Sequence, residues 1–294
     1  MTVTLDDVSN LLHLSIEGRM MDHDAKVDRD HEITLMTRLL GMSDSVARSA
    51  SKTKYGAHIS YPALKRLYEE HLTEARRLED PQTMEWPVER DRRRHWYVRS
   101  FLLYLIGSAL FTNKTNGHIN VIYLDCMVDL NAIGKWSWVG MNLAYMYDYL
   151  NDFVRLCNKT MAGYSYPSKS NKIWKAHMPC AGRWLTRRGQ TTVHHYHRLL
   201  DRIWVDDAKW STYHDHRAVR HFQIICTYSR WLICGKERVY RHLPKRVKRQ
   251  FGYMQDIPKH PSDVPEILVD MMANVFKEPR PWCYSDWEER YEKA

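Results

Sequence analysis

The sequence predicts a mainly α-helical protein, built as a compact multi-helix domain of about seven to nine helices. Apolar side chains recur at three- and four-residue spacing along most of the chain. The 294 residues are 44% apolar and 27% charged, which is enough to form a core and excludes a disordered tail or a membrane-embedded bundle. We expect at most a small β element, near residues 118–124, where apolar and polar residues alternate weakly.

The first two helices are predicted from signals at their ends. Thr4 and Asp7 form a capping signal at the start of a helical apolar pattern. A second apolar group, residues 33–40, ends at Gly41, because glycine adopts the left-handed conformation of a helix C-cap without a steric cost. The Ser- and Lys-rich residues 43–60 are expected to form a loop.

Two long helices are predicted next. Residues 62–78 show the clearest amphipathic pattern, with a proline suited to the first turn. After a proline-containing connector, residues 90–111 form a helix with a basic entrance and an apolar remainder. Its apolar part, residues 101–111, is about half as long as a bilayer requires, and we expect it to be buried in the protein.

The second half of the chain contains one segment of unusual composition. A helix is predicted over about residues 139–157, and residues 158–190 follow with seven basic residues and no acidic residue. We interpret that stretch as a long surface loop or insertion. Further helices are expected over residues 196–205, 218–234 and 262–276.

The net charge of +9 is unevenly distributed. Residues 1–89 carry a net charge of −5, residues 90–260 carry +18 and residues 261–294 carry −4. We expect residues 1–260 to form the domain, and the last segment to add a C-terminal helix and an acidic tail packed on it. The basic middle indicates an anionic partner, either nucleic acid or an acidic protein surface.

The cysteines and the N-terminus indicate an intracellular compartment. No two cysteines have the C-x-x-C spacing of a zinc or redox site, so ordinary thiols are expected. The first residues contain acidic side chains where a signal peptide requires a basic region followed by an apolar run. The six cysteines are Cys126, Cys157, Cys180, Cys226, Cys234 and Cys283.

Two groups of residues have side chains suited to catalysis, and neither predicts an enzyme. Standard nucleophile, phosphate-binding and zinc-protease motifs are absent from the sequence. The histidines that could bind a metal are His194, His195, His197, His214 and His216. The carboxylates that could form a two-metal site are Asp125, Asp129, Asp201, Asp206 and Asp207. We expect surface or core histidines and helix-capping or ion-paired carboxylates, and hence no catalytic residue, metal or cofactor.

Three basic clusters are the candidate contact surfaces. They span residues 90–99, 158–190 and 236–253, and aromatic residues are interleaved with the basic ones in all three. This pattern suits phosphate neutralisation combined with base stacking, although basic helix faces are also commonly solvated or paired with acidic segments of the same chain. The candidate contact residues are Arg92, Arg93, Arg94, Lys172, Lys175, Arg187, Arg188, Lys245 and Lys248.

The last third of the chain resembles a known family. Residues 210–216 read WSTYHDH, and from Pro244 the chain follows the pattern P-x-R-V-x-R-Q-F-G-Y-x-Q-x-I-P. This pattern resembles the most distinctive stretch of the plant mobile domain family, also called aminotransferase-like. The motif residues, for which we expect structural roles, are Trp138, Trp210, Tyr213, Pro244, Arg246, Arg249, Gln250, Phe251, Gly252, Tyr253, Gln255 and Pro258.

The resemblance extends over nearly the whole chain, with departures. VTLDDVSNLLHLSIEG resembles the family's opening, and RSFLLYLIGSALFTNK and the helix after Trp138 resemble its central blocks. Val139 stands where the family has glycine, and residues 158–190 replace a family helix. Either that helix has diverged or the gene model is altered.

The resemblance implies a mostly helical domain of plant transposable elements and of host nuclear proteins. Such proteins, similar to Maintenance of Meristems or to the long form of a plant phosphatase, act in meristem maintenance, genome stability and transposon silencing. We therefore expect a non-enzymatic protein of the nucleus, with a nuclear protein complex and nucleic acid as candidate partners, no membrane contact and an undefined oligomeric state. Two alternatives are a transposon-derived, metal-dependent nuclease or transposase-like protein and a degenerate transposon copy.

Overall fold

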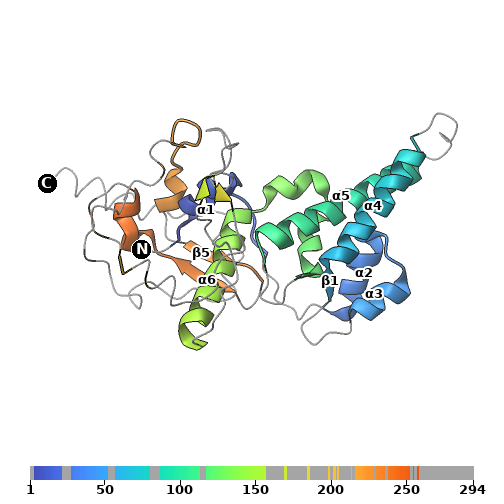
Figure 1. The fold of residues 1–294 in the computed structure, drawn as a ribbon, viewed down its shortest axis with the longest axis horizontal. Coiled ribbons are helices and arrows are strands. Elements are labelled where there is room, and N and C mark those ends of the chain that lie inside the picture. The colour runs from blue at the N-terminus through green and yellow to red at the C-terminus, as the bar shows by residue number, and fades with distance from the viewer. Residues whose placement is uncertain are drawn as a thin grey trace. The chain divides into compact units, whose positions relative to one another are not determined.

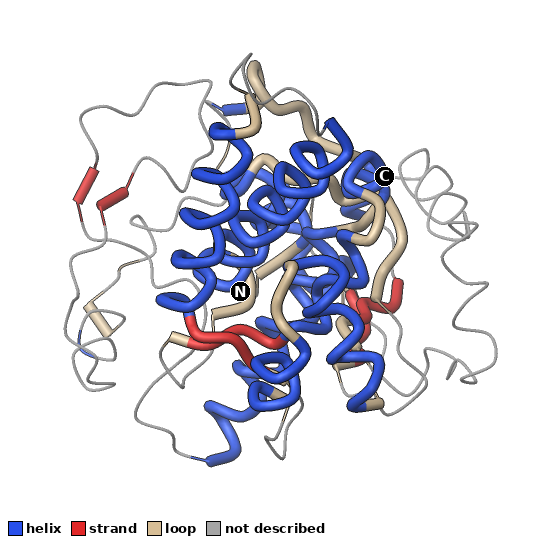
Figure 2. Tube along the Cα trace, turned by 90° about the vertical axis from the view of Figure 1, so that its right-hand side faces the viewer, coloured by secondary structure: helices blue, strands red, loops and turns tan. Residues whose placement is uncertain are grey.

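The computed structural model describes residues 3–21, 28–51, 57–79, 87–112 and 117–156, together with short stretches between residues 169 and 257 (Figure 1). Most of the described elements are helices (Figure 2). The chain divides into two compact units, which we describe separately. The first unit consists of Met1–Asp22, Ser137–Thr160 and Ser165–Ala294, and the second of His23–Trp136 and Met161–Tyr164.

The second unit is built on a helical hairpin. Its helices are α2 (Arg29–Leu40), α3 (Asp44–Ala50), α4 (Tyr61–Arg77) and α5 (Pro87–Ala109). Tyr61, at the start of α4, lies edge-on to Tyr104 near the end of α5, with 5.4 Å between ring centroids. Further along α4, Tyr68 meets Tyr97 in the same way at 6.1 Å. The order of these contacts shows that α4 and α5 run antiparallel, side by side (Figure 1).

The second unit also contains a short two-stranded β sheet. β1 (His58–Ser60) and β2 (His118–Asn120) are antiparallel, with Ile59 opposite Ile119, and the 3-10 helices η2 (Val121–Met127) and η3 (Leu130–Lys135) follow. α5 approaches β2 closely at Gly107, where a Cβ would lie 2.5 Å from the side chain of Ile119. Ile119, Leu103 and Leu40 are buried side chains of the core of this unit.

The first unit contains both the N-terminal and the C-terminal described residues. Its helices and strands are α1 (Leu5–Leu12), α6 (Trp138–Leu156), β3 (Lys169–Ser170), β4 (Trp184–Leu185), η7 (Ile224–Thr227), β5 (Arg230–Ile233), β6 (Val239–His242) and η8 (Pro244–Phe251). β5 and β6 form an antiparallel hairpin that packs on α6, and Leu232 of β5 is fully buried. The chain after α1 is held at the start of α6, because the Ser137 amide donates to the Arg19 carbonyl at 2.7 Å.

Several sequence expectations are confirmed. The fold is mainly helical, and a small β element does occur at residues 118–120. Thr4 and Asp7 form a reciprocal capping box at α1, and Gly41 ends α2 with φ +66°. The helix predicted over residues 139–157 is α6. Cys126, Cys226 and Cys234 are buried free thiols.

Other expectations are wrong in part. The helix predicted over residues 218–234 contains the short helix η7 and then strand β5, so the β content exceeds the one small element expected. Residues 43–60 contain α3 and β1 in addition to loop. The apolar half of α5 is not buried all round, since Phe101 and Leu105 are 48% and 45% exposed.

Some predictions lie outside the described residues. These are the helix at 262–276, the C-terminal segment 261–294, most of the helix at 196–205 and most of the basic stretch 158–190. Of the helices that the structure describes, none has the length and apolar character needed to cross a membrane.

Candidate interaction surfaces

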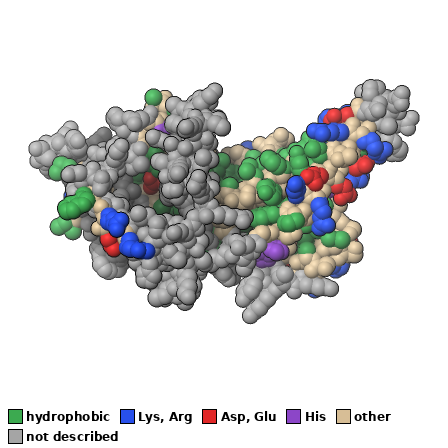
Figure 3. Space-filling view, viewed as in Figure 1, with side chains coloured by type: hydrophobic (Ala, Val, Ile, Leu, Met, Phe, Trp, Pro, Cys, Tyr) green, Lys and Arg blue, Asp and Glu red, His purple; other side chains and the backbone are tan. Residues whose placement is uncertain are grey.

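The first basic cluster, at the start of α5, is paired with carboxylates of its own unit. Arg92 and Arg93 both bond to Glu89, Arg93 through its Nε atom at 2.9 Å. Arg94 pairs with Glu79 at the end of α4 and lies 3.5 Å from Asp91. Figure 3 shows the same mixture, with Lys and Arg side chains interspersed with Asp and Glu along this part of the surface. The positive charge of the cluster is therefore largely offset within the unit.

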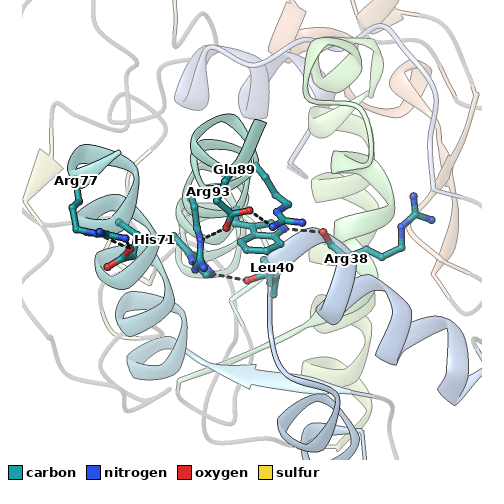
Figure 4. Close-up of polar contacts among 9 residues, drawn as sticks. Arg38, Leu40, His71, Arg77, Glu89 and Arg93 are labelled. Carbon is teal, nitrogen blue, oxygen red and sulfur yellow. Dashed lines mark hydrogen bonds and ion pairs between the residues drawn. The ribbon is translucent and has the colours of Figure 1, made fainter. Parts of the chain in front are cut away.

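A buried histidine sits behind this cluster (Figure 4). His71 of α4 donates from Nε2 to the Leu40 carbonyl at 2.9 Å, and its Nδ1 accepts from Arg93 at 3.2 Å. Burial lowers the pKa of His71, and the neighbouring Arg93 lowers it further. A neutral ring can donate from one nitrogen while it accepts at the other, so these contacts require neutral His71.

Trp96 completes the packing around His71. Its indole N–H donates to the Arg38 carbonyl at 2.8 Å, and its ring lies 5.0 Å from the His71 ring. The guanidinium groups of Arg92 and Arg93 lie over the indole at 5.3 and 5.2 Å. The aromatic group of this cluster is thus engaged by its own neighbours. The contacts of this cluster connect α5 with α4 and with the end of α2.

The second described cluster lies in the first unit and differs in charge balance. Residues 238–251, which we call the basic segment, contain six Lys or Arg residues and no Asp or Glu. They form β6 and η8, whose backbone is kinked at Val247. Within η8, Arg246 and Arg249 are exposed, Lys245 and Lys248 are half-buried, and Pro244 is buried. Of the four basic residues of η8, two are therefore exposed, Arg246 and Arg249.

The hairpin that supports the basic segment is fixed to α6 by a polar contact. The Arg238 Nε atom donates to Asp148 of α6 at 3.0 Å, and the Tyr240 hydroxyl donates to the other carboxylate oxygen at 2.6 Å. Burial and the bond to Asp148 raise the pKa of Tyr240 to about 12. Tyr240 therefore stays protonated at neutral pH and keeps its hydrogen bond.

The aromatic residues of the basic segment and its hairpin are also engaged. The Arg241 guanidinium lies 4.7 Å above the Trp231 ring, directly across the β5–β6 pair. Phe251 packs on Phe222 with 5.6 Å between ring centroids. Basic and aromatic residues alternate in the sequence here, as predicted, but in the fold the aromatic rings contact other side chains.

Sequence reasoning missed a polar network between α1 and residues 213–220. Arg217 makes two bonds to the buried Asp6 carboxylate, at 2.8 and 2.6 Å, and lies 5.2 Å over the Phe222 ring. Arg220 donates to Ser9 Oγ at 2.9 Å and to the Leu14 carbonyl at 2.6 Å. The family patterns at both places were visible in the sequence, but nothing in the spacing indicated that these two segments meet.

Two histidines lie at the edge of this network. The Nε2 atoms of His13 and His216 are 2.7 Å apart, and the rings stack with centroids 5.0 Å apart. Such a contact holds one proton between the two nitrogens, so both rings cannot be charged at once. Burial lowers the pKa of His13, and the charges of Arg220 and His216 lower it further.

The groups considered for catalysis are dispersed where the structure describes them. His216 contacts His13, Asp125 lies 3.0 Å from His31, and Asp129 caps η3 through the Asn131 amide. Among the described residues, His, Cys, Asp and Glu side chains do not gather in groups of three or more that could hold a metal ion. The remaining metal-ligand candidates, apart from Asp201, lie outside the described residues: His194, His195, His197, His214, Asp206 and Asp207.

Some of the remaining predicted site residues lie in the described part of the chain, and others lie outside it. Trp138 is buried, and Tyr213 lies 5.7 Å below the guanidinium of Arg217. Gln250 lies in η8, directly before Phe251 in the chain. Predicted residues that lie outside the described part of the chain are Lys172, Lys175, Arg187, Arg188, Trp210, Gly252, Tyr253, Gln255 and Pro258.

Comparison with known proteins identifies the family. The family profile described as plant mobile domain matches residues 1–278. The chain belongs to the plant mobile domain family. Both the α1 capping box and the network between α1 and residues 213–220 lie within the plant mobile domain match.

Curated proteins of Arabidopsis thaliana show similarity over most of this chain. MAIN-LIKE 1 is 27% identical over 278 residues, and Maintenance of Meristems is 24% identical over 276 residues. Each comparison covers 88% of this chain, but 50% and 53% of the relative. MAIN-LIKE 2 is 25% identical, with 39% of its length covered. The chain thus spans about half the length of the curated relatives it matches or less. No solved structure matches it.

Proposed function

We propose that this plant mobile domain protein acts in the nucleus as a non-enzymatic member of a protein complex at chromatin, in transposon silencing and genome stability. Family membership supports the class of protein, and one of the relatives is named for the maintenance of meristems. The part proposed for the described residues is to contact an anionic partner through the basic segment.

The observation that carries this proposal is the charge of the basic segment. Residues 238–251 contain six Lys or Arg residues and no Asp or Glu, although Arg238 pairs with Asp148 of α6. Arg246 and Arg249 are exposed, so an outside anion can reach them. Runs of Lys and Arg of this kind are typical of nuclear-import or nucleic-acid-binding sequences. Either role requires these side chains on the surface.

The experiment is fluorescence localisation of the tagged full-length chain in plant cells, together with purification of bound proteins from nuclei. We expect nuclear signal and co-purifying chromatin proteins. A variant with Lys245, Arg246, Lys248 and Arg249 replaced by Ala should lose chromatin retention. The matched control replaces Lys65, Arg66, Arg76 and Arg77 of α4 by Ala, which removes the same number of positive charges.

Exclusion of the unaltered chain from nuclei would contradict the proposal. Equal loss of retention in both variants would show that total charge, not the basic segment, determines the effect. The non-enzymatic part has its own readout. Metal-dependent cleavage of labelled DNA by the purified chain, abolished by Asp201→Asn, would favour the nuclease alternative instead.

A further inference from the structure

We infer that two copies of this chain associate through the outward face of the α4–α5 hairpin. This inference goes beyond the proposed function and does not depend on it. Its starting point is a group of large apolar side chains on the surface of the second unit. Phe101, Tyr104 and Leu105 of α5 are 48%, 40% and 45% exposed. In Figure 3, hydrophobic side chains gather on the face of the second unit that is turned to the viewer.

Aromatic rings of α4 extend this surface across the hairpin. The Phe101 ring lies 5.7 Å from the half-buried Tyr68 ring, and the Tyr104 ring lies 5.4 Å from that of Tyr61. The contacts join both helices into one continuous surface, which we call the aromatic face. It consists of Tyr61, Tyr68, Tyr97, Phe101, Tyr104 and Leu105. Contiguous apolar patches bordered by polar residues are typical of protein–protein contact sites.

Two charged side chains on this surface indicate which partner fits it. Lys65 follows Tyr61 by four positions on α4 and precedes Tyr68 by three, so it lies on the same stripe of the helix. Glu69 lies one turn further, and its Oε1 atom is 3.7 Å from the Lys65 Nζ atom. These side chains are 57% and 70% exposed. A purely acidic or purely basic partner would meet one of them as a like charge, whereas a second copy presents both signs.

A two-fold axis across the helices, passing between Lys65 and Glu69, brings opposite charges together. It makes α4 antiparallel to α4 of the second copy, so that each lysine faces the glutamate of the other chain. The axis crosses α5 near Phe101, because Tyr68, which directly precedes Glu69, contacts Phe101. The apolar side chains of both copies therefore meet at the centre of the contact, and the two hairpins form a four-helix arrangement.

The first test is the oligomeric state of the full chain. Sedimentation velocity at about 1 to 100 µM should show a dimer that dissociates on dilution, as a contact of moderate affinity does. Leu105→Glu places a carboxylate within the apolar contact and should raise the dissociation constant by at least about tenfold. Val88→Glu is the matched control, since Val88 is an apolar residue of α5 that is 80% exposed and lies outside the aromatic face. It should leave the dissociation constant within about twofold.

A charge exchange tests the arrangement across the axis. Lys65→Glu gives a chain with two carboxylates at these positions, and Glu69→Lys gives a chain with two ammonium groups. Each variant alone should dimerise more weakly than the unaltered chain, because like charges then face each other. An equal mixture should prefer mixed dimers, in which opposite charges meet again. Co-purification through a tag on one of the two chains, at about 50 mM salt to limit screening, measures the mixed dimer.

A chain that stays monomeric over the whole concentration range would overturn the inference. So would a dimer that persists in folded Leu105→Glu, or a mixture of the two charge variants that shows no preference for mixed dimers. Circular dichroism checks that each variant is folded. The charge exchange alters exposed side chains, so it remains decisive even if Leu105→Glu does not fold. Nuclear localisation and chromatin retention test the proposed function separately from all of these measurements.

Discussion

At the scale of single residues, the contact between Gly41 and Trp96 sets the geometry of the second unit. Gly41 ends α2 with φ +66°, and a Cβ at this position would lie 2.5 to 2.8 Å from three atoms of the Trp96 ring. The ring cannot move away easily, because its N–H is bonded to Arg38 and its face contacts His71. Both the backbone conformation and the packing require glycine here.

We expect Gly41→Ala to lower the free energy of unfolding of the second unit by about 1–3 kcal/mol. Gly235→Ala is the matched control, because Gly235 has a left-handed φ of +77°, close to that of Gly41, but a Cβ added there would meet none of the described atoms within 4 Å. Chemical denaturation of both variants separates the cost of the backbone conformation from that of the clash. Equal losses would show that contact with Trp96 adds nothing.

The histidine pair predicts a loss of stability in acid. The folded state lowers the pKa of His13 below its ordinary value of 6.5, mainly through burial and then through Arg220 and His216. The unfolded chain therefore binds a proton more readily, so the stabilising contribution is present above that value and is lost as the pH falls below it. Asp7 makes the opposite contribution to the pH dependence of stability. Burial raises its pKa, so the folded state binds a proton at a higher pH than the unfolded chain does.

We expect the melting temperature to decrease when the pH is lowered from about 7 to about 5, and to decrease less in His13→Asn. Asparagine suits this position because His13 has φ 55°, a left-handed conformation that Asn tolerates well. His71, whose pKa burial also lowers, leaves part of the acid sensitivity in the variant. An unchanged pH profile in His13→Asn would show that the pair does not contribute.

At the scale of elements, the attachment of α1 to residues 213–220 includes one buried ion pair. Asp6 is 4% exposed and accepts two bonds from Arg217, and its carboxylate also accepts from Asn10 at 3.0 Å. Removing one charge of a buried pair leaves the other without compensation. The segments it joins are more than 200 positions apart in the sequence, so the pair is a long-range constraint on the first unit.

Asp6→Asn should therefore destabilise the first unit by about 2–4 kcal/mol, somewhat less than the about 3–5 kcal/mol typical of fully buried pairs, because the Arg217 side chain is partly exposed. The matched comparison is Asp44→Asn, which removes an exposed Asp–Arg pair within α3 and should have little effect. Hydrogen exchange of α1 amides gives the local readout. Equal losses of stability and equal exchange of the α1 amides in both variants would mean that the buried pair does not hold α1 in place.

The elements also show which parts of the fold the sequence could predict. Local signals were sufficient for α1, α2 and α4, because Thr4, Gly41 and Pro62 act within one turn of the helix end. β5 was misassigned because the apolar residues of 218–234 fit a helical period as well as an alternating one. A hairpin signal was present in Gly235, which turns the chain with φ +77° between apolar strands.

The candidate surfaces were only partly predictable, because the pairing of their charges depends on residues that are distant in the sequence. The charge of 236–253 and of 90–99 can be counted in the sequence, but whether it is offset depends on partners elsewhere in the chain. Glu79, from the end of α4, pairs with Arg94, and this could be known only once α4 and α5 were seen to be antiparallel. The contact of Arg241 with Trp231 likewise depends on the hairpin that sequence reasoning missed.

At the scale of the whole molecule, the net charge of +9 is a poor guide to where an anion binds. Much of the positive charge at the start of α5 is balanced by Glu79, Glu89 and Asp91, and in the basic segment Arg238 is paired with Asp148 of α6. Two variants can therefore remove the same number of positive charges from different parts of the surface. Lys245 and Lys248 suit this comparison because they stand at variable positions of the family pattern.

Lys245→Ala with Lys248→Ala, and Arg92→Ala with Arg94→Ala, each lower the net charge from +9 to +7. If net charge governed association, both would weaken binding to a nucleic acid duplex alike and elute equally early from a cation exchanger. We expect a clear difference in binding. The lysine variant should make the logarithmic slope of affinity against salt shallower by about two units, because each phosphate contact contributes about 0.9. The arginine variant should change the slope less, because the carboxylates that pair with Arg92 and Arg94, on Glu89, Glu79 and Asp91, stay behind and repel an anion.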